Sequence, residues 1–98
     1  MSVTVTYFGH AAFTLSDGTH TVAIDPFFSG NPLAEAAGLT KESINPTHIA
    51  LTHGHVDHVG DTLEIATRCS SQVTLTCVTL NRFCWTIGKM HGVKLASP

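Results

Sequence analysis

Positively charged side chains are scarce in this sequence. It has five Lys and Arg residues against seven Asp and Glu residues, and a formal net charge of −2 with His neutral. Because so few cations cannot form a basic patch for a phosphate backbone, we expect no nucleic-acid partner. No apolar run reaches the ~18 residues that a transmembrane helix needs, so we expect no membrane partner. The first residues alternate like a strand and lack a basic segment, which argues against a signal peptide.

Cysteine is also sparse, and its spacing fits neither a metal site nor a disulfide framework. The three cysteines are Cys69, Cys77 and Cys84, and no two of them form a CxxC pair. An odd count without such a pair is typical of reduced thiols, which predicts a cytoplasmic protein. The chain is long enough for one small domain, and its 43% hydrophobic against 12% charged content indicates a buried, sheet-rich core.

The first half of the chain is predicted to form three short strands and a long loop. Residues alternate over positions 3–8 with the period of a strand, and residues 11–15 and 21–24 are interpreted as a second and a third strand. Asp17-Gly18 predicts the hairpin turn between the second and third strands. Residues 27–46 contain several Gly, Asn and Pro residues, which predicts a loop with one short helix around residues 33–37.

The second half is predicted to alternate strands and helices. We expect strands at residues 47–52 and 72–78, parallel and joined by a right-handed crossover. Between them, one helix is expected to begin near Asp57 or His58, with Leu63 on its inner face and a Glu64–Arg68 ion pair on its outer face. A second helix is expected from Asn81 to Gly92. The fold class is therefore α/β (α+β), a mixed sheet with flanking helices.

Histidine is concentrated in one segment, which reads His53-Gly54-His55-Val56-Asp57-His58. In an extended segment His53 and His55 point the same way, so their imidazoles can reach one metal ion at ~2.0–2.1 Å. Asp57 and His58 lie where the chain turns into the helix, and they can face a second ion about 3.5–4 Å away. The segment follows a predicted strand, where sites in α/β proteins usually form. We therefore predict a centre of two metal ions with His53, His55, Asp57 and His58 as ligands.

This motif, His-x-His-x-Asp-His after a short strand, resembles the signature of the metallo-β-lactamase superfamily. Two further segments, YFGHAAF at residues 7–13 and IDPFFSGNP at residues 24–32, are similar to one branch of it. That branch contains cytosolic metal-dependent hydrolases related to the L-ascorbate-phosphate lactonases. The resemblance is strong over residues 1–68 and weaker from residue 69 to the end.

The resemblance implies an αββα sandwich and a di-zinc hydrolase, with manganese or iron as alternatives. An activated water would attack an ester, lactone or phosphoester of a small-molecule substrate. Asp57 is expected to be both a ligand and a catalytic proton acceptor. Asp25 would support the site from behind the ligands. His10 matches an element at the mouth of the site, with a surface or packing role as the alternative.

The resemblance also implies that ligands are missing. The family completes its metal centre with a later His, a bridging Asp and a final His, all beyond Pro98. We therefore expect residues 1–98 to be the N-terminal half of the domain, with the loss at the C-terminus. The alternatives are a metal-binding fragment without activity, or a module completed by another chain or by a homo-oligomer. A ribonuclease-like role is disfavoured by the low basic content.

A few other residues were weighed as site residues. His91 is interpreted as a helix-end residue, and His20 and His48 as surface or structural residues of strands. Phe27 and Phe28 could either wall a substrate pocket or cover the core.

Overall fold

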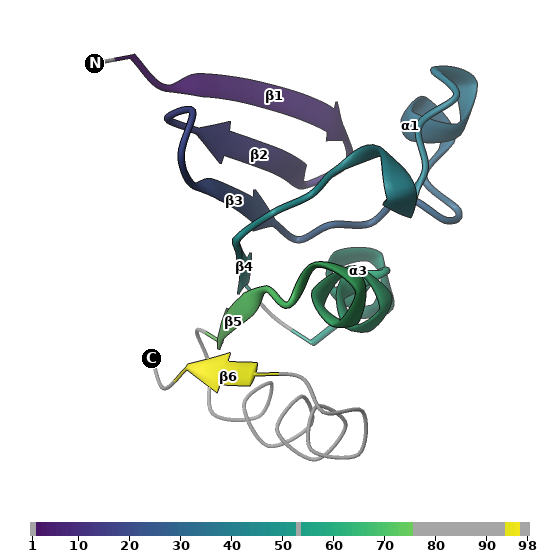
Figure 1. The fold of residues 1–98 in the computed structure, drawn as a ribbon. Helices are drawn as coiled ribbons and strands as arrows, with labels where there is room; N and C mark the ends of the chain where they lie inside the picture. The colour runs from purple at the N-terminus through teal and green to yellow at the C-terminus, as the bar shows by residue number, and fades with distance from the viewer. Residues whose placement is uncertain (1, 53, 76–93, 97–98) are drawn as a thin grey trace.

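The chain folds around one mixed sheet. The computed structural model describes residues 2–52, 54–75 and 94–96. In these ranges six strands form a single sheet in the order β1-β2-β3-β4-β5-β6 (Figure 1). The β1–β2 and β2–β3 pairs are antiparallel and the other three pairs are parallel. The strands are β1 (Thr4–Gly9), β2 (Ala12–Ser16), β3 (Thr21–Ile24), β4 (His48–Leu51), β5 (Gln72–Leu75) and β6 (Lys94–Ala96).

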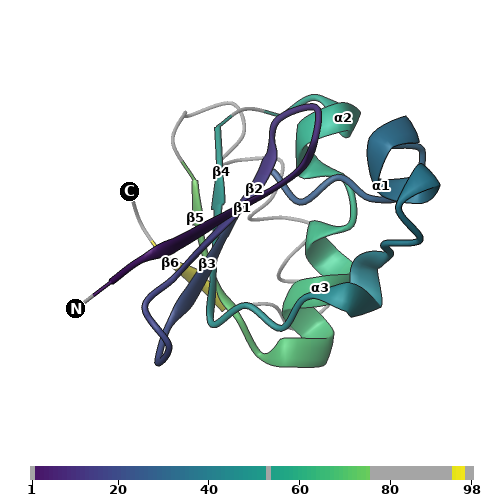
Figure 2. The same cartoon turned by 90° about the horizontal axis from the view of Figure 1, so that it is seen from above.

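The helices in the described part of the chain cover one face of this sheet (Figure 2). They are α1 (Pro32–Ala36), α2 (Val56–Val59) and α3 (Thr62–Cys69), with a 3-10 turn η1 (Lys41–Ser43) between α1 and β4. The predicted mixed sheet with flanking helices, the early hairpin and the short helix near residue 33 are confirmed. The helix expected from Asn81 to Gly92 lies outside the described residues. Within the described ranges no helix has the length and apolar character needed to cross a bilayer.

The prediction of a single helix after the histidine motif is wrong, because the chain breaks between α2 and α3. Gly60 ends α2 with a φ of 49°, and a Cβ at this position would lie 2.6 Å from the Cα of Phe27. The close approach of the Phe27 segment therefore requires glycine here, and the helix restarts after Asp61. The restart also turns α3, so that Ile65 is fully buried while Leu63 is only half-buried.

The predicted Glu64–Arg68 ion pair on α3 is also wrong. Glu64 instead forms an ion pair with Lys41 of η1. The guanidinium of Arg68 donates to the side-chain oxygen of Asn45 at 2.7 Å and to the carbonyl of Ile44 at 2.6 Å. Both side chains thus fasten α3 to the loop before β4, a long-range arrangement that helical spacing alone does not reveal.

The two faces of the sheet differ sharply in burial. Paired residues of neighbouring strands share a face, so the register assigns each side chain to one side. The face under the helices is packed into the core, and its residues are Phe8, Ala12, Thr14, Ala23, Ile49, Leu51 and Val73. The opposite face is apolar as well, but its side chains are exposed or half-buried: Val5, Tyr7, Phe13, Leu15, Val22 and Ile24.

The strand directions bring several chain reversals to one edge of the sheet. Because β2 is antiparallel to both β1 and β3, these two strands run the same way, and β4 runs parallel to β3. The carboxyl ends of β1, β3 and β4 therefore lie at the same edge. The residues that follow these ends are His10, Asp25 and the segment that begins at Thr52.

Candidate metal centre

Asp25 is the buried residue among those at this edge of the sheet. Its side chain is 2% exposed, and its carboxylate accepts three hydrogen bonds. Two come from Thr52, from the backbone N–H at 2.8 Å and from the hydroxyl at 2.6 Å. The third contact is with Nδ1 of His58, at 2.8 Å. A carboxylate in this position fixes the orientation of the imidazole and directs its other nitrogen away from Asp25. The expectation that Asp25 lies behind the motif agrees with this geometry.

The backbone at Asp25 is held in an unusual conformation. Its φ is 45°, a left-handed value that is uncommon outside glycine and that costs ~1–3 kcal/mol when imposed on other residues. The conformation is supported by its backbone N–H, which donates to the carbonyl of Ala50 at 3.1 Å. Asp25 is therefore turned toward Thr52 and His58 at a cost that the surrounding contacts offset.

Asp61 ties the loop after Asp25 to the junction between α2 and α3. Its carboxylate accepts hydrogen bonds from the backbone of Phe28 at 3.0 Å and from the backbone and hydroxyl of Ser29 at 2.9 and 3.0 Å. Its own N–H donates to the carbonyl of Pro26 at 3.0 Å. Asp61 was not predicted to have this role, because the contacts span more than 30 residues of sequence and leave no local signal.

The motif residues at the start of α2 meet His10 at the solvent-facing side of the edge. Nε2 of His10 lies 3.1 Å from Oδ2 of Asp57, and Nε2 of His58 lies 3.8 Å from Oδ1 of the same carboxylate. One ligand atom from each of the three residues falls within 4.8 Å of the other two. The structure thus places Asp57 and His58 in one cluster, and their role as metal ligands stays a prediction. It adds His10, which sequence reasoning placed only at the mouth of the site.

His10 is directed to this cluster by a constrained turn between β1 and β2. Its φ is 55°, again left-handed. The hydroxyl of Tyr7 donates to the carbonyl of His10 at 2.8 Å. The side-chain amide of Asn31 donates to the carbonyls of Gly9 at 3.1 Å and Phe27 at 2.8 Å. Asn31 is buried and also caps α1, and the Asn-Pro pair before a helix is the signal that could have predicted that capping role.

The other half of the motif is only partly described. His53 lies outside the described residues, so the prediction that the imidazoles of His53 and His55 face one ion stays a prediction. His55 is exposed and precedes α2 as its N-cap residue, with its carbonyl accepting from the N–H groups of His58 and Val59 at 3.0 and 2.9 Å. Among the described residues, the three-residue cluster does not include His55.

Phe27 and Phe28 differ in burial, which bears on the two roles considered for them, the wall of a substrate pocket or the cover of the core. Phe28 is 1% exposed and packs in the core, with its ring centroid 5.2 Å from that of Phe8. Phe27 is half-buried, and its ring meets the ring of His10 edge-on at 5.8 Å. His20 is an exposed residue beside Asp17, and Nδ1 of His48 contacts the hydroxyl of Thr47. Neither histidine belongs to the cluster described above.

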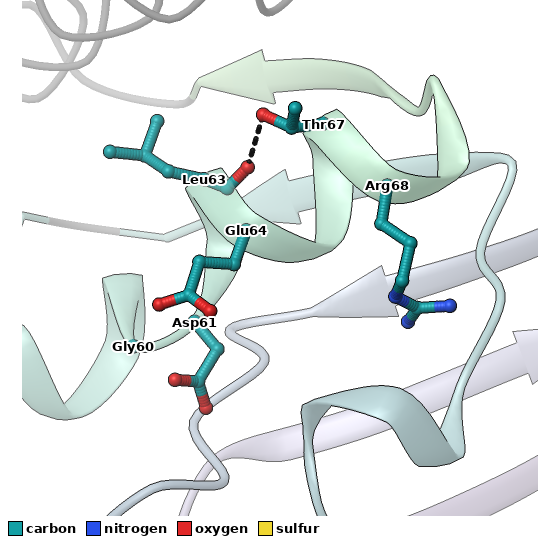
Figure 3. Close-up of a pocket in the computed structure, with 6 residues that line it drawn as sticks. All are labelled: Gly60, Asp61, Leu63, Glu64, Thr67 and Arg68. Atoms are coloured by element: carbon teal, nitrogen blue, oxygen red, sulfur yellow. Dashed lines mark hydrogen bonds between the residues drawn. The ribbon is translucent and has the colours of Figure 1, made fainter.

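A large hollow elsewhere on the surface is not the candidate site. It has a volume of about 570 Å³ and is formed by α3 and the residues just before it (Figure 3). Its polar groups are engaged in holding the fold: Asp61, Glu64 and Arg68 make the contacts given above, and the hydroxyl of Thr67 donates to the carbonyl of Leu63. In Figure 3 the side chains of Glu64 and Arg68 diverge along the helix rather than converging on a shared point.

The chemistry of the clustered donors fits a metal ion. Two imidazoles and one carboxylate are the ligands that zinc, manganese and iron accept in proteins. His58 already has the carboxylate partner that commonly accompanies a ligating imidazole. His10 and Asp57 have side chains 40% and 49% exposed, so an ion could reach them from solvent.

Comparison with known proteins points to the same chemistry. A family model described as a β-lactamase superfamily domain matches residues 4–89. A UPF0173 metal-dependent hydrolase of Methylobacterium nodulans is 49% identical over 71 residues, covering 70% of this chain and 30% of that protein. Another, of Heliobacterium modesticaldum, is 38% identical over 92 residues, covering 93% of this chain and 37% of that protein.

A solved structure agrees with these sequence relatives. Igni18, a metallo hydrolase from the archaeon Ignicoccus hospitalis, superimposes with a TM-score of 0.75 and 28% identity, over 98% of this chain and 39% of that protein. The chain thus spans between 30% and 39% of the length of these three proteins. With a family model that covers most of its residues, the chain belongs to the metallo-β-lactamase superfamily, among relatives named metal-dependent hydrolases.

Proposed function

We propose that this chain supplies the first ligands of a di-zinc hydrolase that acts on an ester, lactone or phosphoester of a small molecule. In this proposal His53 and His55 hold one ion, and Asp57 and His58 hold the other. Manganese and iron are the alternative ions, because the same donors accept them. The relatives' printed names support a metal-dependent hydrolase, and the motif supports two ions.

The contact between Asp25 and Nδ1 of His58 is the observation that carries the proposal. A buried carboxylate that accepts from one imidazole nitrogen makes the other nitrogen a better metal ligand. Nε2 of His58 lies on the side of Asp57, 3.8 Å from its carboxylate. This arrangement supports the proposal, because ligating imidazoles in metal centres commonly have a carboxylate partner of this kind.

The chain's own residues would have distinct tasks in the reaction. When bound, the metal ions would lower the pKa of a water molecule and polarise the scissile oxygen. Asp57 would accept a proton at its carboxylate, which is half-exposed and can be reached by a water molecule. Asp25 keeps His58 oriented throughout, and Phe27 shields one side of the His10 ring from water.

Metal content and turnover test the proposal together. The purified chain is assayed for zinc per molecule, and for hydrolysis of a generic lactone and a phosphodiester with and without a chelator. Stoichiometric zinc with turnover that the chelator abolishes supports the proposal. The double variant His53→Ala/His55→Ala is expected to lose one ion. His20→Ala/His48→Ala, which removes as many imidazoles elsewhere, should bind as much zinc as the parent. Equal metal uptake by both double variants contradicts the assignment.

The half-exposed apolar face of the sheet favours a second candidate, a module completed by another chain or by a second copy. Side chains such as Phe13, Leu15 and Val22 are the type that a second layer covers in a sandwich. In this case the chain binds zinc but shows no chelator-sensitive turnover by itself. Turnover that appears with a C-terminal segment from a longer relative would distinguish this candidate from an inactive fragment.

A further inference from the structure

We propose that His10 is a direct ligand, with Asp57 and His58, of the second metal ion. The inference rests on the proposed function and deepens it, because it assigns to this ion a ligand from outside the histidine motif. The site would then combine the turn between β1 and β2 with the start of α2, two segments that are more than 40 residues apart in the sequence.

The distances suit a shared ion. In a tetrahedral zinc site with bonds of ~2.0–2.1 Å, neighbouring ligand atoms lie about 3.3 Å apart. Nε2 of His10 lies 3.1 Å from Oδ2 of Asp57, and Nε2 of His58 lies 3.8 Å from Oδ1, the other oxygen of the same carboxylate. One ligand atom from each of the three residues falls within 4.8 Å of the other two, so the three donors are grouped closely enough to share an ion.

The turn that carries His10 is built at an energetic cost. A left-handed backbone in a residue other than glycine costs ~1–3 kcal/mol, and such strain is typical of functional positions. Gly9 beside it also has a positive φ, of 102°, and a Cβ there would lie 2.6 Å from Oδ1 of Asn31. Tyr7 and Asn31 fasten the carbonyls of this turn. Positive φ values also occur in ordinary two-residue hairpin connections, but here the contacts of the turn hold the imidazole of His10 beside Asp57 as well.

The surroundings of the His10 ring are those of a ligand. The ring packs edge-on against Phe27 at 5.8 Å and against the ring of His58 at 5.1 Å. These contacts limit its rotation while its side chain stays 40% exposed. The nitrogen nearest the carboxylate of Asp57 is Nε2, which a ring held in this way keeps at the cluster. A histidine with only a packing role would direct its apolar edge inward and its nitrogens to water.

The competing explanation is that His10 only donates a hydrogen bond to Asp57. Glutamine distinguishes the two, because its amide nitrogen reaches about as far as Nε2 and donates to a carboxylate, but it is not a zinc ligand. Asparagine provides a second check, because it tolerates left-handed backbone and so preserves the turn. The variants are therefore His10→Gln and His10→Asn, with His10→Ala beside them.

The test is zinc affinity by competition with a chromophoric chelator, together with the visible spectrum of bound Co²⁺, on the full 98-residue chain. His58→Ala is the positive control and His20→Ala, at an exposed histidine, the neutral one. If His10 is a ligand, all three His10 variants lose affinity for one ion by more than the 10–100-fold typical of an outer partner, and the Co²⁺ spectrum changes as in His58→Ala. Urea unfolding with its midpoint near the parent's shows that the variants are folded.

Two results overturn the inference. His10→Gln with the affinity and Co²⁺ spectrum of the parent, while His10→Ala is weakened, makes His10 a positioning residue for Asp57. His10→Ala with unchanged affinity removes any role at the ion. Both leave the proposed function intact, because His58→Ala still loses its ion. A parent chain that binds no zinc contradicts the proposed function and this inference together.

Discussion

Two carboxylates flank His58 and differ in almost every respect. Asp25 is 2% exposed and has a strained backbone, and its oxygens accept from Thr52 and His58. Asp57 is 49% exposed on a short helix, and its neighbours are the imidazoles of His10 and His58. A buried carboxylate satisfied by the protein holds structure, whereas an open one beside two imidazoles is available for an ion. We therefore expect Asp25 to matter most for stability and Asp57 most for metal binding.

The largest expected loss of stability follows from Asp25→Ala. The substitution leaves the N–H and hydroxyl of Thr52 and Nδ1 of His58 without their acceptor, and it puts alanine at a positive φ. Removing one partner of a buried charged network costs about 3–5 kcal/mol. The free energy of unfolding is measured by urea titration. Asp25→Asn, which keeps one acceptor oxygen and tolerates the backbone, should lose less, and an unchanged midpoint for Asp25→Ala contradicts the role of Asp25.

The next largest effect is expected at Gly60, where the end of the helix that carries Asp57 packs against the loop after Asp25. A Cβ there lies 2.6 Å from the Cα of Phe27 and 2.7 Å from the carbonyl oxygen of Pro26, and φ is 49°. We expect Gly60→Ala to destabilise the chain by about 3 kcal/mol, from strain and overlap together. Gly38 is the matched control, because its φ is 73° but nothing lies within 4 Å of the added carbon. Equal losses at the two glycines would show that the close approach has no energetic weight.

A much smaller effect on stability is expected for Asp57→Asn, which is the reverse of the behaviour of Asp25. The side chain is half-exposed, so the free energy of unfolding of the metal-free chain should change by less than about 0.5 kcal/mol. Zinc bound per chain should nevertheless fall by one ion. Urea titration with a chelator present and metal analysis of the same preparation measure the two quantities. A destabilisation as large as that of Asp25→Ala would remove the contrast between the two carboxylates.

The smallest effect is expected at a third carboxylate, Asp17, in the turn between β2 and β3. The N–H groups of His20 and Thr19 donate to it and lower the pKa of Asp17 from its ordinary value of 3.8. The charged form is favoured in the folded state, so its contribution is present above pH 3.8 and is lost as the pH falls through the lowered pKa. Asp17→Asn should flatten this part of the stability profile, measured by unfolding between about pH 2 and pH 5. An identical acid slope in the variant contradicts the assignment.

Local pattern was sufficient for most of the sheet, and it singled out the histidine motif as the candidate site. Alternation predicted the strand near residues 3–8, and a short apolar run predicted the strand near residues 47–52. That Asp57 and His58 are metal ligands stays a prediction. These features depend on neighbours in the sequence, or on a spacing whose chemistry is known. The position of Asp25 behind His58 was expected from the family resemblance, and the hydrogen bond at 2.8 Å agrees with it.

The features that sequence reasoning missed depend on contacts between distant segments. The break at Gly60 follows from the approach of Pro26 and Phe27, more than 30 residues away. The approach of His10 to Asp57 follows from the shared direction of β1 and β3, together with a left-handed turn. Strand direction could have been inferred from two successive hairpin reversals. The left-handed backbone conformation that directs the His10 side chain could not be inferred, because a histidine at this position does not by itself specify that conformation.

The uncovered face of the sheet also bears on how long the free chain would survive in a cell. The exposed or half-buried side chains of Val5, Phe13 and Leu15 form the kind of apolar surface that chaperones and proteases recognise on incompletely folded proteins. The edge strand β1 adds backbone groups that can pair with another strand. Wherever this surface stays exposed to solvent, we expect the cellular lifetime of the chain to be short.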